Sequence, residues 1–207
     1  MQTGAQAGDA ILGGVDDAEL IETRISSQLI HRGGYLTFRV DTVADALGRE
    51  HHRDVVEHPG AVAIVALVGP DVLLVRQFRT PVGRICLEIP AGTLDRQADG
   101  SVEDPSLAAP RELAEETGHR AGVWRLLGRF YTAPGFADEE MHLFLATELE
   151  AIPGYAGPDT DERLHALRVP WRRAVEMAEE GLIDDAKSLV GLFWLARLVE
   201  RGEILPV

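Results

Sequence analysis

The chain of 207 residues is poor in cysteine, in aromatic side chains and in positive charge. Cys86 is its single cysteine, which excludes an intrachain disulfide and fits a reducing compartment. Lysine and arginine number 20 against 34 aspartates and glutamates, so the formal net charge is -14. Non-specific nucleic-acid binding needs a cationic surface, and this balance argues against it. A phosphorylated small molecule is still compatible if local arginines and a metal ion offset the repulsion.

Long apolar runs are also absent. No stretch approaches the roughly 18 apolar residues of a membrane span, and the N-terminus has no signal-peptide pattern. We therefore expect a cytoplasmic protein without a membrane span. Residues 1–16 are rich in Gly, Ala and Gln without periodicity and predict a disordered tail.

Short apolar and alternating segments predict many strands and few helices. Gly33-Gly34 and Gly69-Pro70 are turn signals between pairs of such segments. Helices are expected near 105–117, 170–180 and 185–201; in the last, an apolar face is formed by Leu189, Leu192, Phe193, Leu195, Ala196 and Val199. Strands are expected near 20–30, 35–43, 53–58, 61–68, 71–79, 85–95, 123–132, 140–149 and 164–169. This mixture favours an α+β sandwich over a doubly wound sheet.

The segment "DPSLAAPRELAEETG", residues 104–118, has clear helix boundaries. Asp104 is a good N-cap, Pro105 suits the first helical position, and Gly118 suits a left-handed C-terminal cap. Pro110 removes one backbone hydrogen bond. Either the helix bends there or its regular part begins at Pro110, and residues 111–117 stay helical in both cases.

The same helix concentrates negative charge. Side chains three or four residues apart share a face, so Glu112, Glu115 and Glu116 point in similar directions while Leu113 faces the core. Arg111 can pair with Glu115 at i, i+4. A solvated acidic face is one interpretation. The other is a divalent cation, for which oxygen ligands without a His or Cys cluster favour Mg²⁺, with Mn²⁺ as a substitute.

The context of these glutamates resembles the Nudix box, G-x5-E-x7-R-E-U-x-E-E-x-G-U, where U is apolar. Glu103 is followed after seven residues by "RELAEETG", which begins at Arg111. Two positions depart from the pattern. Ten residues instead of five separate Gly92 from Glu103, an insertion within 93–102 that a loop tolerates, and His119 replaces the final apolar residue. We interpret His119 as partly exposed packing.

The resemblance extends over roughly residues 20–200 and is closest to the ADP-ribose pyrophosphatase branch. The segments that carry it are "VEHPGAVAIVAL", "LVRQFRTPVGR", "LEIPAGTLD", "FYTAPGFADEE" and "EEGLIDDAKSLVGLFWL". Pro134-Gly135, whose proline stands sixteen residues after Gly118, would otherwise be an ordinary turn. The resemblance implies a Nudix α/β/α sandwich with a mixed sheet at 59–207 and a small antiparallel β domain at 17–58. It also implies a homodimer in which the N-terminal domains are swapped.

Site residues follow from the same resemblance. It implies metal binding by Glu112, Glu116, Glu115 and the carbonyl of Ala91, with Arg111 orienting the carboxylates. It places Arg53 and Arg79 near the substrate phosphates, although either could be an ordinary surface arginine. It implies that Pro134 and Gly135 belong to a substrate-binding loop and that Tyr35 or Phe38 of the partner subunit stacks on adenine, although either ring could simply pack. The base that activates water would be Glu162, with Asp161 as the alternative.

The predicted reaction is hydrolysis of ADP-ribose to AMP and ribose 5-phosphate with Mg²⁺. Another nucleotide sugar, such as ADP-glucose or GDP-mannose, is the alternative substrate. A module that senses ADP-ribose without cutting it would have lost a metal-binding glutamate, whereas this chain keeps them all. An acidic interaction protein would leave the spacing of the box unexplained.

Overall fold

The computed structural model describes residues 17–157 and 163–205, and the chain divides into two compact units between Glu57 and His58. The first unit is an antiparallel sheet of three strands, β1 (Thr23–Arg32), β2 (Thr37–Ala44) and β3 (Glu50–Glu57), preceded by the short 3-10 helix η1 (Asp17–Leu20). The expected hairpin is confirmed: β1 and β2 pair through the Gly33-Gly34 turn. Every residue of β1 is exposed, so this strand leaves apolar side chains uncovered.

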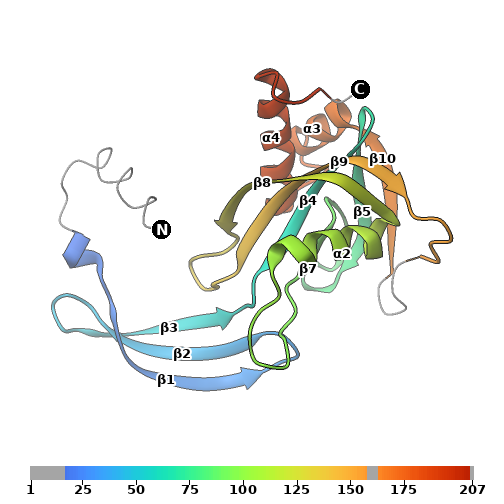
Figure 1. The fold of residues 1–207 in the computed structure, drawn as a ribbon. Helices are drawn as coiled ribbons and strands as arrows, with labels where there is room; N and C mark the ends of the chain where they lie inside the picture. The colour runs from blue at the N-terminus through green and yellow to red at the C-terminus, as the bar shows by residue number, and fades with distance from the viewer. Residues whose placement is uncertain (1–16, 158–162, 206–207) are drawn as a thin grey trace. The chain divides into compact units, whose positions relative to one another are not determined.

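The second unit is built on a mixed sheet of seven strands (Figure 1). Its central path runs β10-β5-β4-β9-β8, with β6 beside β5 and β7 beside β4. The pair β4–β9 is parallel and the other pairs are antiparallel. The strands are β4 (Ala61–Val68), β5 (Asp71–Arg79), β6 (Arg84–Glu88), β7 (Ala91–Thr93), β8 (His119–Tyr131), β9 (Glu140–Ala151) and β10 (Leu164–Pro170), and the 3-10 turn η2 (Thr80–Val82) joins β5 to β6.

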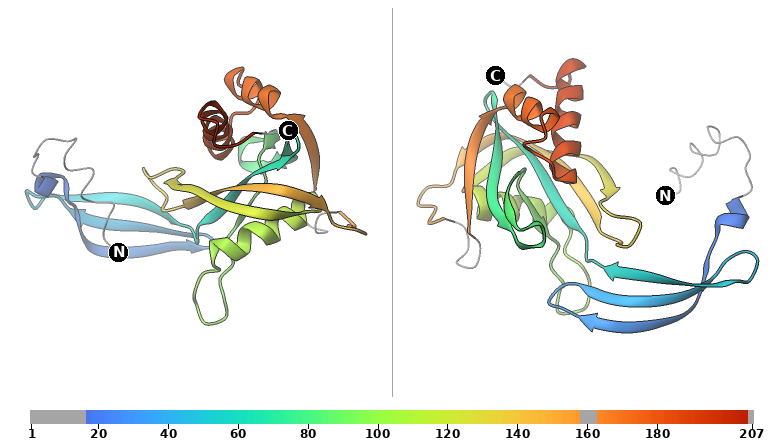
Figure 2. Two further views of the ribbon diagram at one scale, coloured as in Figure 1. Left: turned by 45° about the horizontal axis from the view of Figure 1, so that its top comes forward. Right: turned by 180° about the vertical axis from the view of Figure 1, so that it is seen from behind.

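Helices cover both faces of this sheet (Figures 1 and 2). They are α2 (Pro105–Thr117) on one face and α3 (Trp171–Glu179) with α4 (Ala186–Glu200) on the other. Strand β4 is buried on both sides, which explains its unbroken apolar sequence. Its alternate residues enter opposite cores: Ala63 and Val65 pack with α3 and α4, while Val62 and Ile64 pack with α2. The predicted α/β/α sandwich with a mixed sheet is therefore confirmed.

Helix α2 runs from Pro105 through Pro110 to Thr117, which agrees with the predicted helix and rules out the alternative that its regular part begins at Pro110. One expectation about helix α4 is wrong. Helix α4 buries Ser188, Gly191, Leu192, Leu195 and Leu198, whereas Phe193 is 41% exposed. The predicted apolar face included Phe193, which lies outside the contact with the sheet. It missed Ser188 and Gly191, which lie inside this contact. Among the described residues, no helix has the length and apolar character required to cross a membrane.

The orientation of α4 predicts losses of stability of different size for two neighbouring truncations. Leu192 is fully buried, so Leu192→Ala should lower the free energy of unfolding by about 2–5 kcal/mol. Phe193→Ala serves as the control and should cost less than about 1 kcal/mol, since its ring is already partly in solvent. Urea unfolding monitored by circular dichroism measures both. An equal loss for the two variants would contradict the helix orientation.

Candidate functional site

Helix α2 begins and ends where its capping residues require. The Asp104 side chain accepts a hydrogen bond from the Ser106 N–H at 2.8 Å, and Pro105 occupies the first turn. Gly118 adopts φ 66°, a left-handed conformation that favours glycine, and its N–H donates to the Ala114 carbonyl. Both predicted boundaries are confirmed. They fix the helical register of every residue of the box between them.

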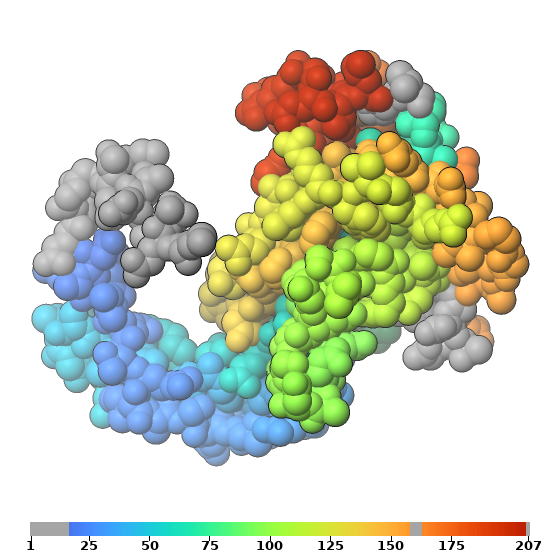
Figure 3. Space-filling model, viewed as in Figure 1, coloured from blue at the N-terminus to red at the C-terminus, as the bar shows by residue number. Residues whose placement is uncertain are grey.

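Two of the three glutamates on α2 point inward. Glu112 is 8% exposed and Glu116 is 4% exposed, and between them Leu113 is fully buried in the core under the sheet. Glu115 is half-buried. The outer side of α2 and the loop before it form part of the visible surface in Figure 3, where they are green. The interpretation of all three glutamates as a solvated face is therefore wrong for Glu112 and Glu116.

Both buried carboxylates meet the short segment that contains Ala91 and Gly92. The Ala91 N–H donates a hydrogen bond to Glu116 Oε2 at 3.0 Å. A Cβ atom on Gly92 would lie 1.9 Å from the Glu112 carboxyl carbon, so any other residue here would displace this carboxylate from its position. The absence of a side chain on Gly92 therefore leaves space for a carboxylate of α2. Sequence spacing did not reveal this contact.

Arg111 connects the loop before α2 to the glutamates of the helix. Its Nε and Nη2 donate to Glu103 at 3.1 and 2.7 Å, and its Nη1 donates to Glu115 at 2.9 Å. The same Nη1 lies 2.8 Å from a carboxylate oxygen of Glu112. The hydrogen bonds from Arg111 lower the pKa of Glu103, and those same bonds raise the pKa of Arg111. The predicted Arg111–Glu115 pair is confirmed, and Glu103 is an additional partner that the sequence analysis did not assign.

The insertion at 93–102 does not disturb this geometry because it closes on itself. Arg96 and Val102 form an isolated bridge, and the Gln97 N–H donates to the Ser101 carbonyl. At its base the Glu103 N–H donates to the Asp95 carbonyl at 2.8 Å. The additional residues therefore project as a turn, and Glu103 returns to a position where it can hold Arg111.

Arg79 is the predicted phosphate-binding arginine of the second unit. Its Nε and Nη2 donate to the two carboxylate oxygens of Glu88 at 2.8 and 2.7 Å. Burial raises the pKa of Glu88, but hydrogen bonds and charge from Arg79 and Lys187 outweigh it and lower this pKa to about 2. The hydrogen bond to Glu88 raises the pKa of Arg79, and the negative charge of Glu116 contributes to that shift. Arg79 therefore lies in the electrostatic field of the box.

A tyrosine that sequence reasoning missed lies on the C-terminal end of α2. The Tyr155 hydroxyl donates to the Glu115 carbonyl at 2.6 Å, and its ring is so close to Gly118 that a Cβ there would lie 2.4 Å from it. The Ile152 N–H donates to the Gly118 carbonyl. The segment after β9 is thus attached to the helix end. An isolated tyrosine in a Pro/Gly-rich loop offered no signal for this contact.

The remaining predicted residues lie elsewhere. Pro134 and Gly135 are exposed in the turn between β8 and β9. His119 begins β8, is half-buried and contacts Arg168, in agreement with a packing role. Arg53, Tyr35 and Phe38 belong to the first unit. Arg53 pairs with Glu22, Tyr35 is 54% exposed beside the β1–β2 turn, and Phe38 is half-buried. Glu162 and Asp161 lie outside the described residues.

The residues of α2 fit a divalent cation chemically. Within 17–157 and 163–205, no three His, Cys, Asp or Glu side chains are already arranged as a metal cage. Glu112 is turned to Arg111 and Glu116 to the Ala91 N–H, yet both carboxylates are buried on one face beside residues 91–92. This all-oxygen set, with a glycine that leaves space for Glu112, suits a hard cation such as Mg²⁺ or Mn²⁺.

Two relatives match most of the chain. A protein from Bacillus subtilis named ADP-ribose pyrophosphatase is 37% identical over 177 residues, which are 85% of this chain and 93% of the relative. A protein from Mycobacterium tuberculosis with the same name is 43% identical over 159 residues, or 76% of this chain and 73% of the relative.

A solved structure and a family model agree with them. The structure, titled "Crystal structure of ADP compounds hydrolase", superposes with a TM-score of 0.74 at 22% identity and covers 88% of this chain and 97% of its own, which shows the shared fold. The model of the NUDIX domain matches residues 57–190, a range that contains the complete box on α2. The chain therefore belongs to the NUDIX domain family.

Proposed function

We propose that this protein hydrolyses the diphosphate bond of ADP-ribose to give AMP and ribose 5-phosphate. The observation that carries the proposal is the pair of buried carboxylates, Glu112 and Glu116, held against Ala91 and Gly92. Two relatives that match most of the chain are named for this activity. Nudix hydrolases generally use divalent metal ions, and we propose Mg²⁺, with Mn²⁺ as a substitute, for this chain.

In the proposed mechanism, the carboxylates of Glu112 and Glu116 and the carbonyl of Ala91 would hold the cation, and Glu115 would contribute directly or through water. A bound divalent ion would polarise the diphosphate, offset charge in the transition state and make water more acidic. Arg111 restrains Glu112 and Glu115 so that their oxygens stay oriented. Glu162 takes a proton from the attacking water, and Asp161 is the alternative base.

The proposed substrate contacts combine two arginines and two loops. Arg79 and Arg53 bind phosphate oxygens, for which the planar guanidinium is well suited. Pro134 and Gly135 shape the sugar site, and Tyr35 or Phe38 of the partner subunit stacks on adenine. In a chain of net charge -14, these arginines and the cation supply the attraction that an anionic substrate needs.

We further propose that residues 17–58 form a swapped β domain in a homodimer, that residues 59–207 form the catalytic domain, and that the protein is cytoplasmic. The support for the dimer is the uncovered apolar surface of the first unit: Leu20, Ile21, Ile25, Leu29, Ile30 and Tyr35 are all exposed. Sedimentation equilibrium should give twice the chain mass of 22.6 kDa. A monomer at micromolar concentration would contradict the swap.

Products distinguish this activity from its alternatives. With Mg²⁺ and a panel of ADP-ribose, ADP-glucose and GDP-mannose, chromatography should show AMP appearing fastest from ADP-ribose. Faster release of a mononucleotide from ADP-glucose or GDP-mannose would contradict ADP-ribose as the substrate and indicate that nucleotide sugar in its place. Tight ADP-ribose binding without products would indicate a sensing module, and no interaction would leave only an acidic interaction protein.

Removing one carboxylate charge tests the cation site. Glu116→Gln should lower kcat by more than about 100-fold and weaken Mn²⁺ binding while the fold persists, because an amide oxygen is a poor replacement for an ionised ligand. Steady-state kinetics, Mn²⁺ titration by electron paramagnetic resonance and thermal unfolding measure these effects.

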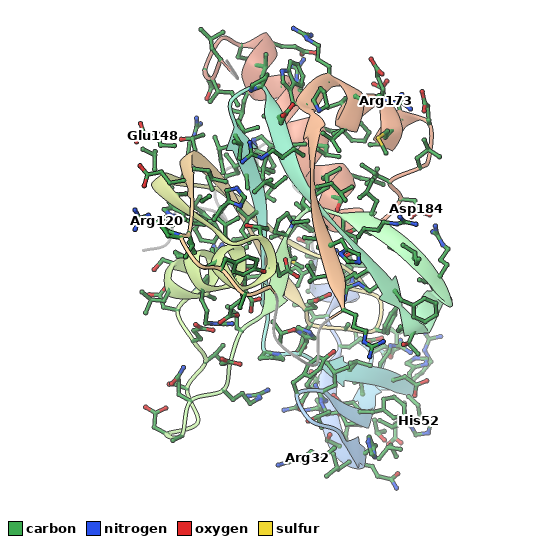
Figure 4. All side chains as sticks on the ribbon, turned by 90° about the vertical axis from the view of Figure 1, so that its right-hand side faces the viewer. Arg32, His52, Arg120, Glu148, Arg173 and Asp184 are labelled. Atoms are coloured by element: carbon green, nitrogen blue, oxygen red, sulfur yellow. The ribbon has the colours of Figure 1, made fainter. Side chains whose placement is uncertain are left out.

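Glu150→Gln is the matched control, since Glu150 is exposed and pairs with Arg120, which is labelled on the outside of the unit in Figure 4. Unchanged turnover of Glu116→Gln would remove Glu116 from the metal site.

A carboxylate-to-amide substitution also tests the proposed general base, Glu162. Glu162→Gln should lower kcat by about 10²–10⁴-fold, the usual contribution of a general base, without weakening Mn²⁺ binding. The pH dependence of kcat should lose its acidic limb in this variant. If activity is retained, Asp161→Asn should show the loss instead, and full activity of both variants would exclude this loop as the source of the base.

A further inference from the structure

One carboxylate of the second unit is buried outside the helix that carries the box. Glu88, the last residue of β6, is only 1% exposed and accepts hydrogen bonds from Arg79 on β5 and from Lys187 on α4. Burying a charge without partners is costly, and these two cations compensate Glu88. Its position between apolar residues in "CLEIP" would otherwise call for an apolar side chain.

The first turn of α4 is built to reach this carboxylate. Lys187 Nζ also donates to Asp185 Oδ1 at 2.8 Å, and Asp185 caps the helix by accepting from the Ser188 N–H. The Ser188 hydroxyl, which is fully buried, accepts a hydrogen bond from the Ile89 N–H at 2.8 Å. The segment "DAKS" therefore attaches to residues 88–89, which directly precede Pro90 and the segment Ala91–Gly92 that contacts the glutamates of α2.

The two parallel hydrogen bonds from Arg79 to Glu88, here called the Arg79–Glu88 fork, leave one edge of the guanidinium for a ligand. Glu88 occupies Nε and Nη2, while Nη1 has no hydrogen-bond partner among the described residues. The Arg79 side chain is 41% exposed, and the field of Glu116 acts on it. Because the guanidinium is a rigid plane, fixing one edge fixes the direction of the other.

Lys187 matters for the charge that Arg79 presents. With Glu88 alone, Arg79 would form a nearly neutral pair and attract an anion weakly. Lys187 shares this carboxylate with Arg79, so the charge of Arg79 is less completely cancelled by Glu88. Asp185, which contacts Lys187, offsets part of this gain.

We propose that Glu88 and Lys187 are positioning residues that hold Arg79 with its Nη1 edge ready to bind a phosphate oxygen of the diphosphate. This inference rests on the proposed function and assigns a role to the "DAKS" turn. The competing account is that the four charges only attach α4 to the sheet.

A double-mutant comparison separates the two accounts. Lys187→Met and Glu88→Gln should each raise KM for ADP-ribose about tenfold, with kcat changed less than about threefold, as expected for lost ground-state and transition-state binding. In an Arg79→Ala background the same changes should alter KM less than about twofold, because both act through Arg79. Asp184→Asn, which removes an exposed partner of Arg84 and is labelled in Figure 4, is the control and should leave KM unchanged.

Binding of inorganic pyrophosphate with Mg²⁺, measured by calorimetry, keeps this test independent of the substrate. If the unmodified protein binds pyrophosphate but does not cut ADP-ribose, the proposed function fails while the positioning role can still be measured. Should Glu88→Gln not fold, Lys187→Met decides, since it preserves side-chain length and leaves the Arg79–Glu88 fork. Equal losses with and without Arg79, or a lowered melting temperature with unchanged KM and pyrophosphate affinity, would overturn the proposal.

Discussion

The contact between helix α2 and residues 91–92 is the constraint on which the rest of the site depends. Glu112 and Glu116 are one helical turn apart and buried, and each has its carboxylate against this short segment. A side chain on Gly92 would occupy the space of the Glu112 carboxylate. The α2 caps, the self-closing insertion and the sheet beneath all hold the two sides of this contact in register.

Paired charges are the second principle of the structure. Two arginines lie near the glutamates of α2, and each is held by a carboxylate that is not on this helix: Arg111 by Glu103 and Arg79 by Glu88. Because each guanidinium is already held by its carboxylate, the arginine side chain loses less conformational entropy when it binds a ligand. They also allow an acidic protein to present oriented positive charge where a diphosphate would bind. The acidic composition and the proposed anionic substrate are therefore compatible.

Much of this arrangement was predictable from local sequence signals. Asp104, Pro105 and Gly118 give the limits of α2, and the continuous apolar run of β4 indicates a strand buried on both faces. Long-range contacts were not predictable in the same way. The contact of Gly92 with Glu112 and that of Tyr155 with Glu115 join residues distant in sequence, and no local pattern encodes them.

The positions of Phe193 and Pro110 have a physical reason. Phe193 is apolar, but the close packing of Gly191 against the sheet turns α4 so that Phe193 faces outward. Pro110 lies inside α2 because the lost backbone hydrogen bond is outweighed by the burial of Ala108, Ala109 and Leu113 in one core. Tertiary packing overrides local propensity in both cases.

The central claim is that Glu112 and Glu116 are metal ligands, and a crystal grown with Mn²⁺ tests it most directly. Anomalous scattering should place a manganese ion between these carboxylates, with the Ala91 carbonyl among its ligands and Arg111 still bound to Glu103. An ion found only at other carboxylates, with Glu112 and Glu116 keeping their contacts to Arg111 and the Ala91 N–H, would contradict the account.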